Sequence, residues 1–363
     1  MRNPNEPAEG QARGGATSPA PRRVSARYMH GPVADVALAL AWAPFALAAR
    51  VLETGGNQAA LTAFISGVFL LSFAHQPLTV ALVYGDPTQF RLRRAIFTWS
   101  PLIFVVAVTA GYFVSFLLVA VIGGLWNAEH TLMQRYGVTR IYGRMADQSE
   151  GTVEKVLLFS WLVAAALWVA ADPATPGRTN DLPLGDNNKV AITTLAQLRP
   201  YAFALLVPVV IVAAVFAVRW FRDEIGRPTV NPMKWVYLGS TLALFGVIMI
   251  DPLVGIMGYV GAHALEYFVI VHQSMGRRYV SAEQDEGALL GRAVRAKTGR
   301  LGFLAVYVGI IVGIITILER AGSPLAYAIV FFTLGGLHVF YDGFIWKLRR
   351  PAVAQSLAIP TGP

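Results

Sequence analysis

Residues 251–272 read DPLVGIMGYVGAHALEYFVIVH, a mostly apolar run that also carries two histidines. A membrane-spanning helix needs about 20 mainly apolar residues, so this stretch predicts a transmembrane helix. The Asp251-Pro252 junction is typical of a helix start, because proline at a first helical position needs no hydrogen-bond acceptor. An ionisable side chain at membrane depth costs roughly 2.5–3.5 kcal/mol on insertion scales and usually faces protein or water. We therefore predict that His263 faces the interior of a helical bundle and has a functional role there.

The composition of the whole chain is that of a membrane protein. Of the 363 residues, 55% are apolar and 14% are charged, with a mean hydropathy of +0.52, whereas soluble domains carry about 25% charged residues. The apolar runs are continuous rather than alternating, which disfavours a β-barrel. The absence of cysteine excludes disulfides, thiolate ligands and iron–sulfur clusters. We predict an all-α, polytopic helical bundle in the inner (plasma) membrane.

About ten membrane-spanning helices are predicted, within a range of eight to ten. Residues 91–126 are too long for one span, so we divide them at Ala110-Gly111. Pro44 is predicted to kink the first helix, and Pro77 to make the backbone irregular beside His75. The predicted helices cover residues 33–52, 60–84, 91–109, 112–138, 154–171, 201–219, 234–250, 251–272, 301–319 and 324–346.

Basic residues favour ten spans and set their orientation. With residues 91–126 divided, most of the 30 Lys and Arg fall on the cytoplasmic side and both termini are cytoplasmic. We interpret residues 1–30 as a disordered cytoplasmic tail, 31–350 as the transmembrane domain and 351–363 as a second cytoplasmic tail. The net charge of +9 is explained by this topology, and no nucleic-acid partner is predicted, because the basic residues lie at the ends of apolar segments.

Four predicted helices carry a histidine toward the same end of the bundle. These histidines are His75, His130, His263 and His338. All four helices run from outside to inside in the ten-span topology, and a rise of about 1.5 Å per residue allows the histidines to share one layer in the cytoplasmic half. Glu266 lies three residues after His263, and Asp342 lies four residues after His338. Each carboxylate therefore shares a helix face with its histidine.

Imidazoles joined by one or two carboxylates suit a metal ion. The predicted metal ligands are His75, His130, His263, His338, Glu266 and Asp342. Iron is the first choice, with zinc, manganese or copper as alternatives, and haem is a further alternative cofactor. Carboxylates that are not ligands would orient the imidazoles. His272 lies nine residues after His263, about 180° round the same helix, and is predicted to face elsewhere. His30, which precedes the first helix, is predicted to be an ordinary histidine.

Three blocks resemble motifs of a largely uncharacterised family of bacterial polytopic membrane proteins. The blocks are Trp126-x-x-x-His130-x-x-x-Gln134-x-Tyr136-Gly137, His263-Ala-Leu-Glu-Tyr267 and His338-x-x-x-Asp342-x-x-Ile345-Trp346-Lys347. This resemblance implies a shared architecture and no activity. A more distant similarity links the chain to membrane histidine-cluster oxygenases, such as desaturases and bacterial carotene-cleaving dioxygenases. It is an analogy that implies only imidazoles gathered near the cytoplasmic face.

Three functions follow from these features. The first is a metal-dependent membrane oxidoreductase, a non-haem iron enzyme that acts on a lipid or isoprenoid, with membrane lipid and a lipophilic small molecule as partners. The second is a proton- or metal-coupled transporter, since intramembrane histidines and carboxylates also build ion relays. The third is a bis-histidine haem protein for electron transfer. The sequence makes no prediction of the oligomeric state.

Overall fold

The computed structural model describes residues 23–25, 27–174, 197–280, 289–347, 353 and 356–357, and most of them are helical. The predicted all-α class is confirmed, while most of the two predicted tails lies outside the described residues. Two short strands, β1 (Arg23–Val24) and β2 (Thr229–Val230), pair in parallel. The helices are α1 (Pro32–Ala39), α2 (Trp42–Thr54), α3 (Gln58–Tyr84), α4 (Pro87–Leu92), α5 (Arg94–Arg144), α6 (Thr152–Ala171), α9 (Arg199–Ile225), α10 (Pro232–Ile250), α11 (Pro252–Met275), the π-helix η1 (Gly276–Val280), α12 (Leu289–Arg295), α13 (Gly299–Ala321) and α14 (Pro324–Ile345).

Eight helices in the described part of the chain are long and apolar enough to cross a membrane, which indicates a multi-pass membrane protein. They are α3, residues Arg94–Phe116 of α5, α6, α9, α10, Pro252–Tyr279, α13 and α14. Helices α1 and α2, bent by 44° against each other, together make a ninth candidate. The remaining predicted span, 112–138, corresponds to the second half of α5, which is helical but is not among these candidates.

Helix α5 turns back on itself at one residue. Ser115 has extended dihedral angles (φ −167°, ψ 107°) inside an otherwise helical segment. Its side-chain hydroxyl accepts a hydrogen bond from the backbone N–H of Leu118, which caps the helix that follows. The predicted division at Ala110-Gly111 was therefore a few residues early, because the serine cap, rather than the small residues, sets the break. We call residues 94–114 and 116–144 the first and second arms of α5.

The two prolines behave differently from the prediction. The first span does bend, but between α1 and α2 at Leu40-Ala41, and Pro44 lies in the first turn of α2. The first turn is where a missing backbone N–H removes no helical hydrogen bond, so Pro44 starts a helix rather than kinking one. Helix α3 remains helical through Pro77, so the irregular backbone predicted beside His75 is not found.

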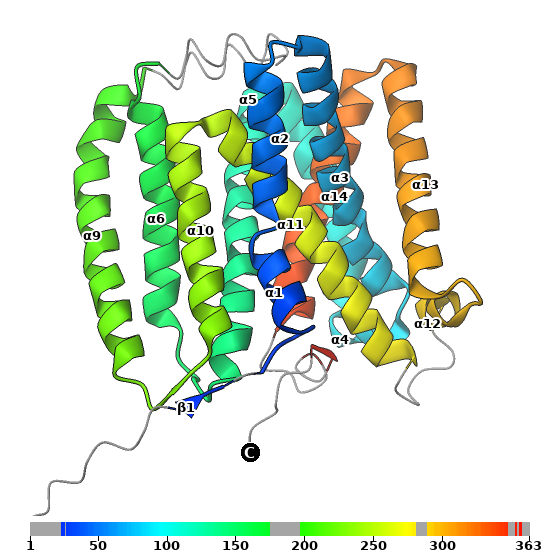
Figure 1. The fold of residues 1–363 in the computed structure, drawn as a ribbon. Coiled ribbons are helices and arrows are strands. Elements are labelled where there is room, and N and C mark those ends of the chain that lie inside the picture. Colours follow the sequence, from blue (N-terminus) through cyan, green and yellow to red (C-terminus); the bar gives the residue numbers. More distant parts are fainter. Residues whose placement is uncertain are drawn as a thin grey trace, which may run out of the picture.

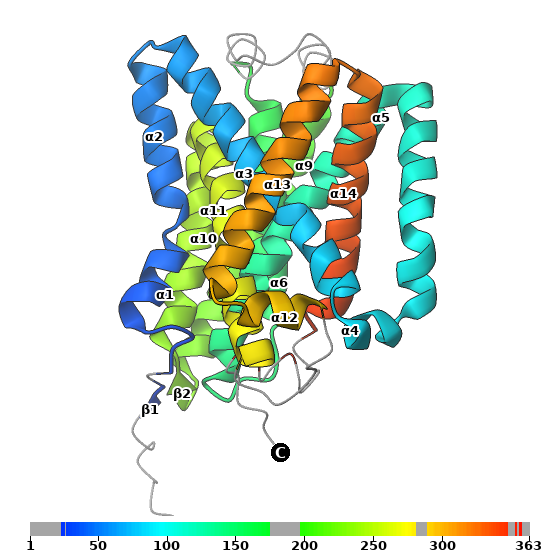
Figure 2. The ribbon, with the colours of Figure 1, turned by 90° about the vertical axis from the view of Figure 1, so that its right-hand side faces the viewer.

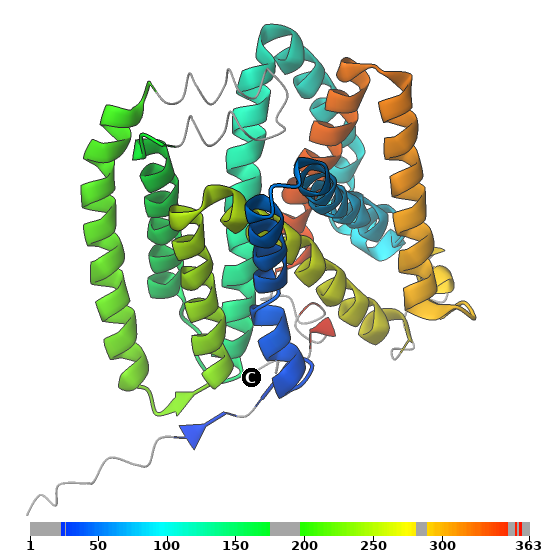
Figure 3. The same cartoon turned by 45° about the horizontal axis from the view of Figure 1, so that its top comes forward.

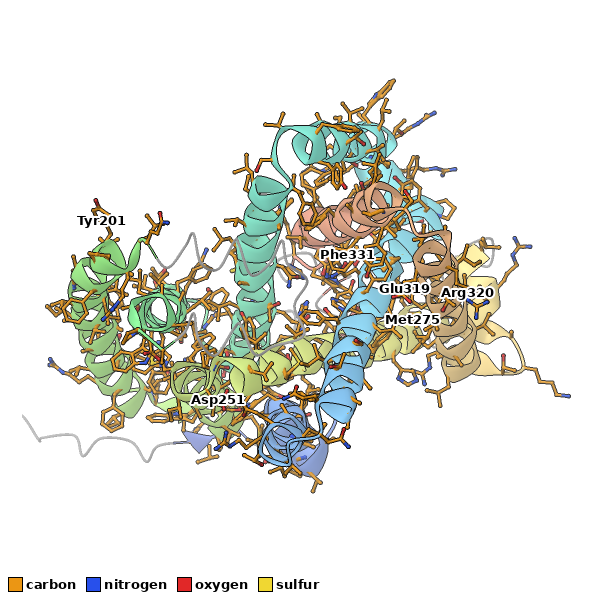
Figure 4. The ribbon with its side chains drawn as sticks, turned by 90° about the horizontal axis from the view of Figure 1, so that it is seen from above. Tyr201, Asp251, Met275, Glu319, Arg320 and Phe331 are labelled. Atoms are coloured by element: carbon orange, nitrogen blue, oxygen red, sulfur yellow. The ribbon has the colours of Figure 1, made fainter. Side chains whose placement is uncertain are left out.

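The helices form a bundle in which α11 occupies the centre. In Figure 1, α9, α6 and α10 stand on one side, α3, α13 and α14 on the other, and α11 runs between them. Figure 4 shows α11 crossing the molecule obliquely from Asp251 to Met275, and Figure 3 places α13 at the opposite edge from α9. The first arm of α5 stands at the outer edge beside α14 (Figure 2). Of the candidate spans, the window containing α11 is the most buried, which fits its central position.

A buried cluster of charges joins α6, α9 and α10 near the end of the bundle where β1 lies (Figure 1). Lys234, on α10, is fully buried. Its Nζ lies 2.5 Å from Oε1 of Glu154 on α6 and 2.5 Å from Oε1 of Glu224 on α9. The Gln148 side chain accepts a further hydrogen bond from Nζ at 2.6 Å. Because buried charges need such partners, these contacts hold the three helices in one arrangement.

Candidate metal centre

Four helices each contribute one histidine to the middle of the bundle. His75 comes from α3, His130 from the second arm of α5, His263 from α11 and His338 from α14. They are nearly or completely buried, with exposed fractions of 0%, 8%, 2% and 0% in that order. The structure therefore brings together the four histidines that the sequence predicts in one layer.

Two glycines let aromatic side chains of neighbouring helices pack closely behind His263 and His338. Gly261 precedes His263 by two residues, and a Cβ atom there would lie 2.6 Å from the ring of Phe45 on α2. Gly336 precedes His338 by two residues, and a Cβ atom there would lie 2.5 Å from the ring of Phe104 on the first arm of α5. Residues two apart on a helix face nearly opposite directions. Each glycine thus accepts an aromatic ring on the outer face, while the histidine faces the centre.

The imidazoles meet through their Nε2 atoms. Nε2 of His75 lies 3.1 Å from that of His263 and 3.2 Å from that of His338. Nε2 of His338 also lies 3.0 Å from that of His130. Neighbouring rings stand almost perpendicular to each other, with interplanar angles between 82° and 89° for these three pairs.

Hydrogen bonds alone explain this arrangement poorly. An imidazole Nε2 carries either one proton or one lone pair, so it makes one good hydrogen bond. Nε2 of His75 and Nε2 of His338 each face two other Nε2 atoms at 3.0–3.2 Å. A metal ion satisfies converging lone pairs at once: two nitrogens about 2.1 Å from one ion and about 95° apart are about 3.1 Å from each other. The observed spacing is compatible with imidazoles that share a metal ion.

Two groups of side chains have donor atoms close enough to share an ion. One is His75, His263 and His338, and the other is His130, His338 and Asp342, with the ligand atoms of each group within 4.8 Å of one another. Oδ2 of Asp342 lies 3.7 Å from Nε2 of His130. His338 belongs to both groups and is the central member of the cluster.

Hydroxyl groups hold His338 and Asp342 in place. Oγ1 of Thr79 donates to Oδ1 of Asp342 at 2.9 Å and lies 2.7 Å from Nδ1 of His338. The threonine oxygen therefore accepts the Nδ1 proton, which leaves the lone pair of His338 on Nε2, facing the cluster. The Tyr267 hydroxyl donates to the same Asp342 oxygen at 3.1 Å and also contacts Thr79. Tyr267 is not among the predicted site residues, although it lies one helical turn after His263.

Replacing Thr79 with valine should weaken metal binding by about 10–100-fold, the usual cost of losing a partner that orients a ligand. Valine matches the shape of threonine but cannot accept the His338 proton. Competition with a graded series of chelators measures the change. Thr62→Val is the matched control, because Thr62 lies on the same helix, is exposed, and donates only to the Gln58 carbonyl. Equal affinities for the two variants would contradict this role of Thr79.

Glu266, a predicted ligand, lies beside the cluster but faces another partner. Its Oε1 lies 2.5 Å from Nη1 of Arg135, and its Oε2 accepts a hydrogen bond from Gln134 at 3.1 Å. Gln134 also donates to the His263 carbonyl at 3.2 Å. Arg135 is 1% exposed and further donates to Thr241 and the Ala39 carbonyl. Glu266 is in neither candidate metal group, and its ion pair ties α11 to α5.

The other two histidines lie apart from the site. Nδ1 of His30 lies 3.3 Å from Oδ1 of Asp35. The backbone carbonyl of His272 accepts a hydrogen bond from Arg300, and its side chain is half-buried. Neither residue joins a candidate metal group among the described residues.

A cavity of about 680 Å³ adjoins the cluster between the second arm of α5 and α14. His130 and Asp342 form part of its wall, so the cavity reaches the candidate ligands directly. Most of the remaining wall is apolar. The apolar and aromatic lining includes Trp126, Met133, Val138, Ile141, Ile270, Val339, Phe340 and Phe344.

No protein-family model matches the chain, and searches of curated proteins and of solved structures found no match. The function must therefore be inferred from the site itself. The resemblance carried by the three histidine-containing blocks stays a prediction.

Proposed function

We propose that the protein is a membrane metalloenzyme, a non-haem iron oxidoreductase that acts on a lipid or isoprenoid chain. One observation carries the proposal: two side chains of the buried histidine cluster, His130 and Asp342, also line an apolar cavity. A large apolar pocket with a few convergent polar groups is the usual form of a binding site for a small apolar molecule. An apolar chain in this cavity lies next to the metal ligands.

The proposed ligands are the four cluster histidines, with Asp342 as a fifth group on the cavity side. Imidazole and carboxylate donors suit iron, and also zinc, manganese and copper. A bound iron ion would supply one-electron redox chemistry with dioxygen as oxidant. The protein's own residues would do the rest: Thr79 and Tyr267 orient the donors, and the apolar wall aligns the substrate and keeps water out.

The geometry favours this proposal over the two alternatives. In a bis-histidine haem site, two Nε2 atoms face each other across the iron, and the porphyrin fills the plane between them. Here a third and a fourth imidazole lie within 3.0–3.2 Å of their neighbours and take that space. A transporter needs polar surroundings along an ion path, whereas the wall of the adjoining cavity is mainly apolar.

The oxidation itself is tested with the iron-reconstituted protein, a membrane lipid extract, ¹⁸O-labelled dioxygen and ascorbate as electron donor, because inserting one oxygen atom and reducing the other to water consumes two electrons. We expect lipid products that contain the heavy isotope, detected by mass spectrometry, and none from a His338→Ala variant. Iron-loaded protein that leaves every lipid in the extract unchanged would overturn the proposed reaction.

Filling the cavity should stop the reaction without removing the metal. Gly343 lines the cavity next to Asp342, and nothing lies within 4 Å of the position its Cβ would take. Gly343→Leu should lower turnover by roughly 10²-fold, since small misplacements of a substrate cost that much, while metal content stays unchanged. Gly239→Leu is the control: Gly239 is exposed on α10 with equally open space around it. Full turnover by Gly343→Leu would show that substrate does not use this cavity.

A further inference from the structure

The two ends of the cavity carry opposite charges, and this points to one class of substrate. We infer that the cavity binds a single-chain amphiphile with an anionic head, a long-chain fatty acid, with its carboxylate at Lys347 and its chain passing His130 and Asp342. This inference rests on the proposed function, because it names the substrate class of the same site.

The acidic and basic residues of the cavity wall lie at different positions along the helix axes. Glu129 and Arg140 both line the cavity from the second arm of α5, and their eleven-residue separation corresponds to about 16 Å along the helix. Lys347 lines the cavity just after the end of α14. The second arm and α14 both run toward the end of the bundle at which β1 lies (Figures 1 and 2), so Arg140 and Lys347 lie toward that end and Glu129 lies farther from it.

Lys347 is the better anion partner of the two cations. Arg140 is already occupied, since it donates to the Gln148 carbonyl at 2.7 Å and lies 3.7 Å from Glu154. Within the described part of the chain, Lys347 forms no ion pair, and its Nζ lies 5.4 Å from the centre of the Phe344 ring on the cavity wall. A carboxylate head is attracted to Lys347 and repelled by Glu129. The charges therefore also fix the direction of the bound chain.

The cavity has room for a long acyl chain. Its volume is about 680 Å³, and its wall is mainly apolar from Trp126 to Phe344. A single-chain fatty acid can therefore lie along this wall with its head at Lys347.

The position of Lys347 also predicts which carbons meet the cluster. Lys347 follows Asp342 by five residues, about 7.5 Å along a helix axis. An extended chain advances about 1.2 Å per bond, as an extended backbone does. A fatty acid whose carboxylate lies at Lys347 would place its sixth carbon, to about one position, beside Asp342 and His130.

Binding of radiolabelled palmitate to the metal-free, full-length protein in detergent micelles tests the charged end. Lys347→Gln should weaken palmitate binding about tenfold or more, the usual value of a hydrogen bond to a charged group, and should leave hexadecanol binding unchanged. Arg93→Gln is the matched control, because the Arg93 guanidinium lies 6.0 Å from the centre of the same Phe344 ring but Arg93 does not line the cavity. Unchanged palmitate affinity in Lys347→Gln would overturn the inference.

Photocrosslinking tests the direction of the chain in the same metal-free protein. Palmitate with a diazirine near about the sixth carbon should label peptides containing Met133 or Gly343, both on the cavity wall. A diazirine at the far end of the chain should label the peptide containing Trp126. Labels confined to the exposed faces of α9 and α13 would contradict the inference. Since neither readout needs metal, failure to bind metal would overturn the proposed function and leave these results standing.

Discussion

Replacing His338 with alanine should remove the bound metal almost completely. His338 is common to both candidate metal groups, and its Nε2 lies within 3.2 Å of the Nε2 atoms of His75 and His130. Losing the central donor should lower the affinity by more than the 10–100-fold that follows from losing an orienting partner. Elemental analysis of purified protein, with chelator competition for the residual affinity, measures the effect.

His272→Ala is the matched control, because this histidine lies on α11 with His263 but joins no candidate group. Its metal content should equal that of the unmodified protein. Size-exclusion chromatography of both variants in detergent separates loss of metal from loss of fold. A folded His338→Ala protein with full metal content would show that the histidine cluster is not the metal site.

Replacing Lys234 with methionine should destabilise the protein by about 3–5 kcal/mol, the cost of breaking a buried ion pair from one side. The substitution leaves Glu154 and Glu224, which are 2% and 0% exposed, without their shared cation. The free energy of unfolding in mixed micelles measures the change. Lys155→Met is the control, because Lys155 is exposed and forms no ion pair within 4 Å among the described residues, and its Nζ lies 5.6 Å from the centre of the Phe159 ring.

A rescue experiment separates charge from packing at Lys234. Changing Glu154 and Glu224 to glutamine in the Lys234→Met background removes the two carboxylate charges that share Lys234, so part of the lost stability should return, although Arg227 and Arg140 then lose a carboxylate neighbour. If the triple variant is as unstable as Lys234→Met, the loss comes from packing and not from the ion cluster.

The helical class and the meeting of the four histidines can be predicted from the sequence, because both depend on spacing along single helices. Apolar length defines a span, and counting from helix ends places each histidine at a depth. The break in α5 was placed a few residues early, because it depends on the Ser115 hydroxyl capping the next helix. Small residues such as Ala110 and Gly111 permit a turn without requiring one.

The partners of the buried charges could not be predicted in the same way. Arg135 and Lys234 lie inside or at the start of the predicted helices 112–138 and 234–250 with no predicted partner, and they are 1% and 0% exposed. Each pairs with a carboxylate on another helix, Arg135 with Glu266 and Lys234 with Glu154. Such pairing depends on how helices pack against each other, which the periodicity of one helix does not reveal. Spacing along α11 therefore does not reveal that Glu266 pairs with Arg135.

The hydroxyl groups that contact Asp342 can be predicted from the sequence only in part. Thr79 lies four residues after His75 on α3, but its side chain contacts His338 and Asp342 on α14. Tyr267 lies four residues after His263, and the same spacing rule that selected Glu266 applies to it. Searching that helix face for hydroxyl groups as well as carboxylates would have found it.

The metal content of the unmodified, full-length protein, purified without added chelator, tests the central claim most directly. Elemental analysis should find about one transition-metal ion per chain, and X-ray absorption should show a first coordination layer of imidazole nitrogens at about 2.1 Å. Protein that contains no transition metal, and that binds none when iron, zinc, manganese or copper is added, would contradict the metal centre and with it the proposed enzyme.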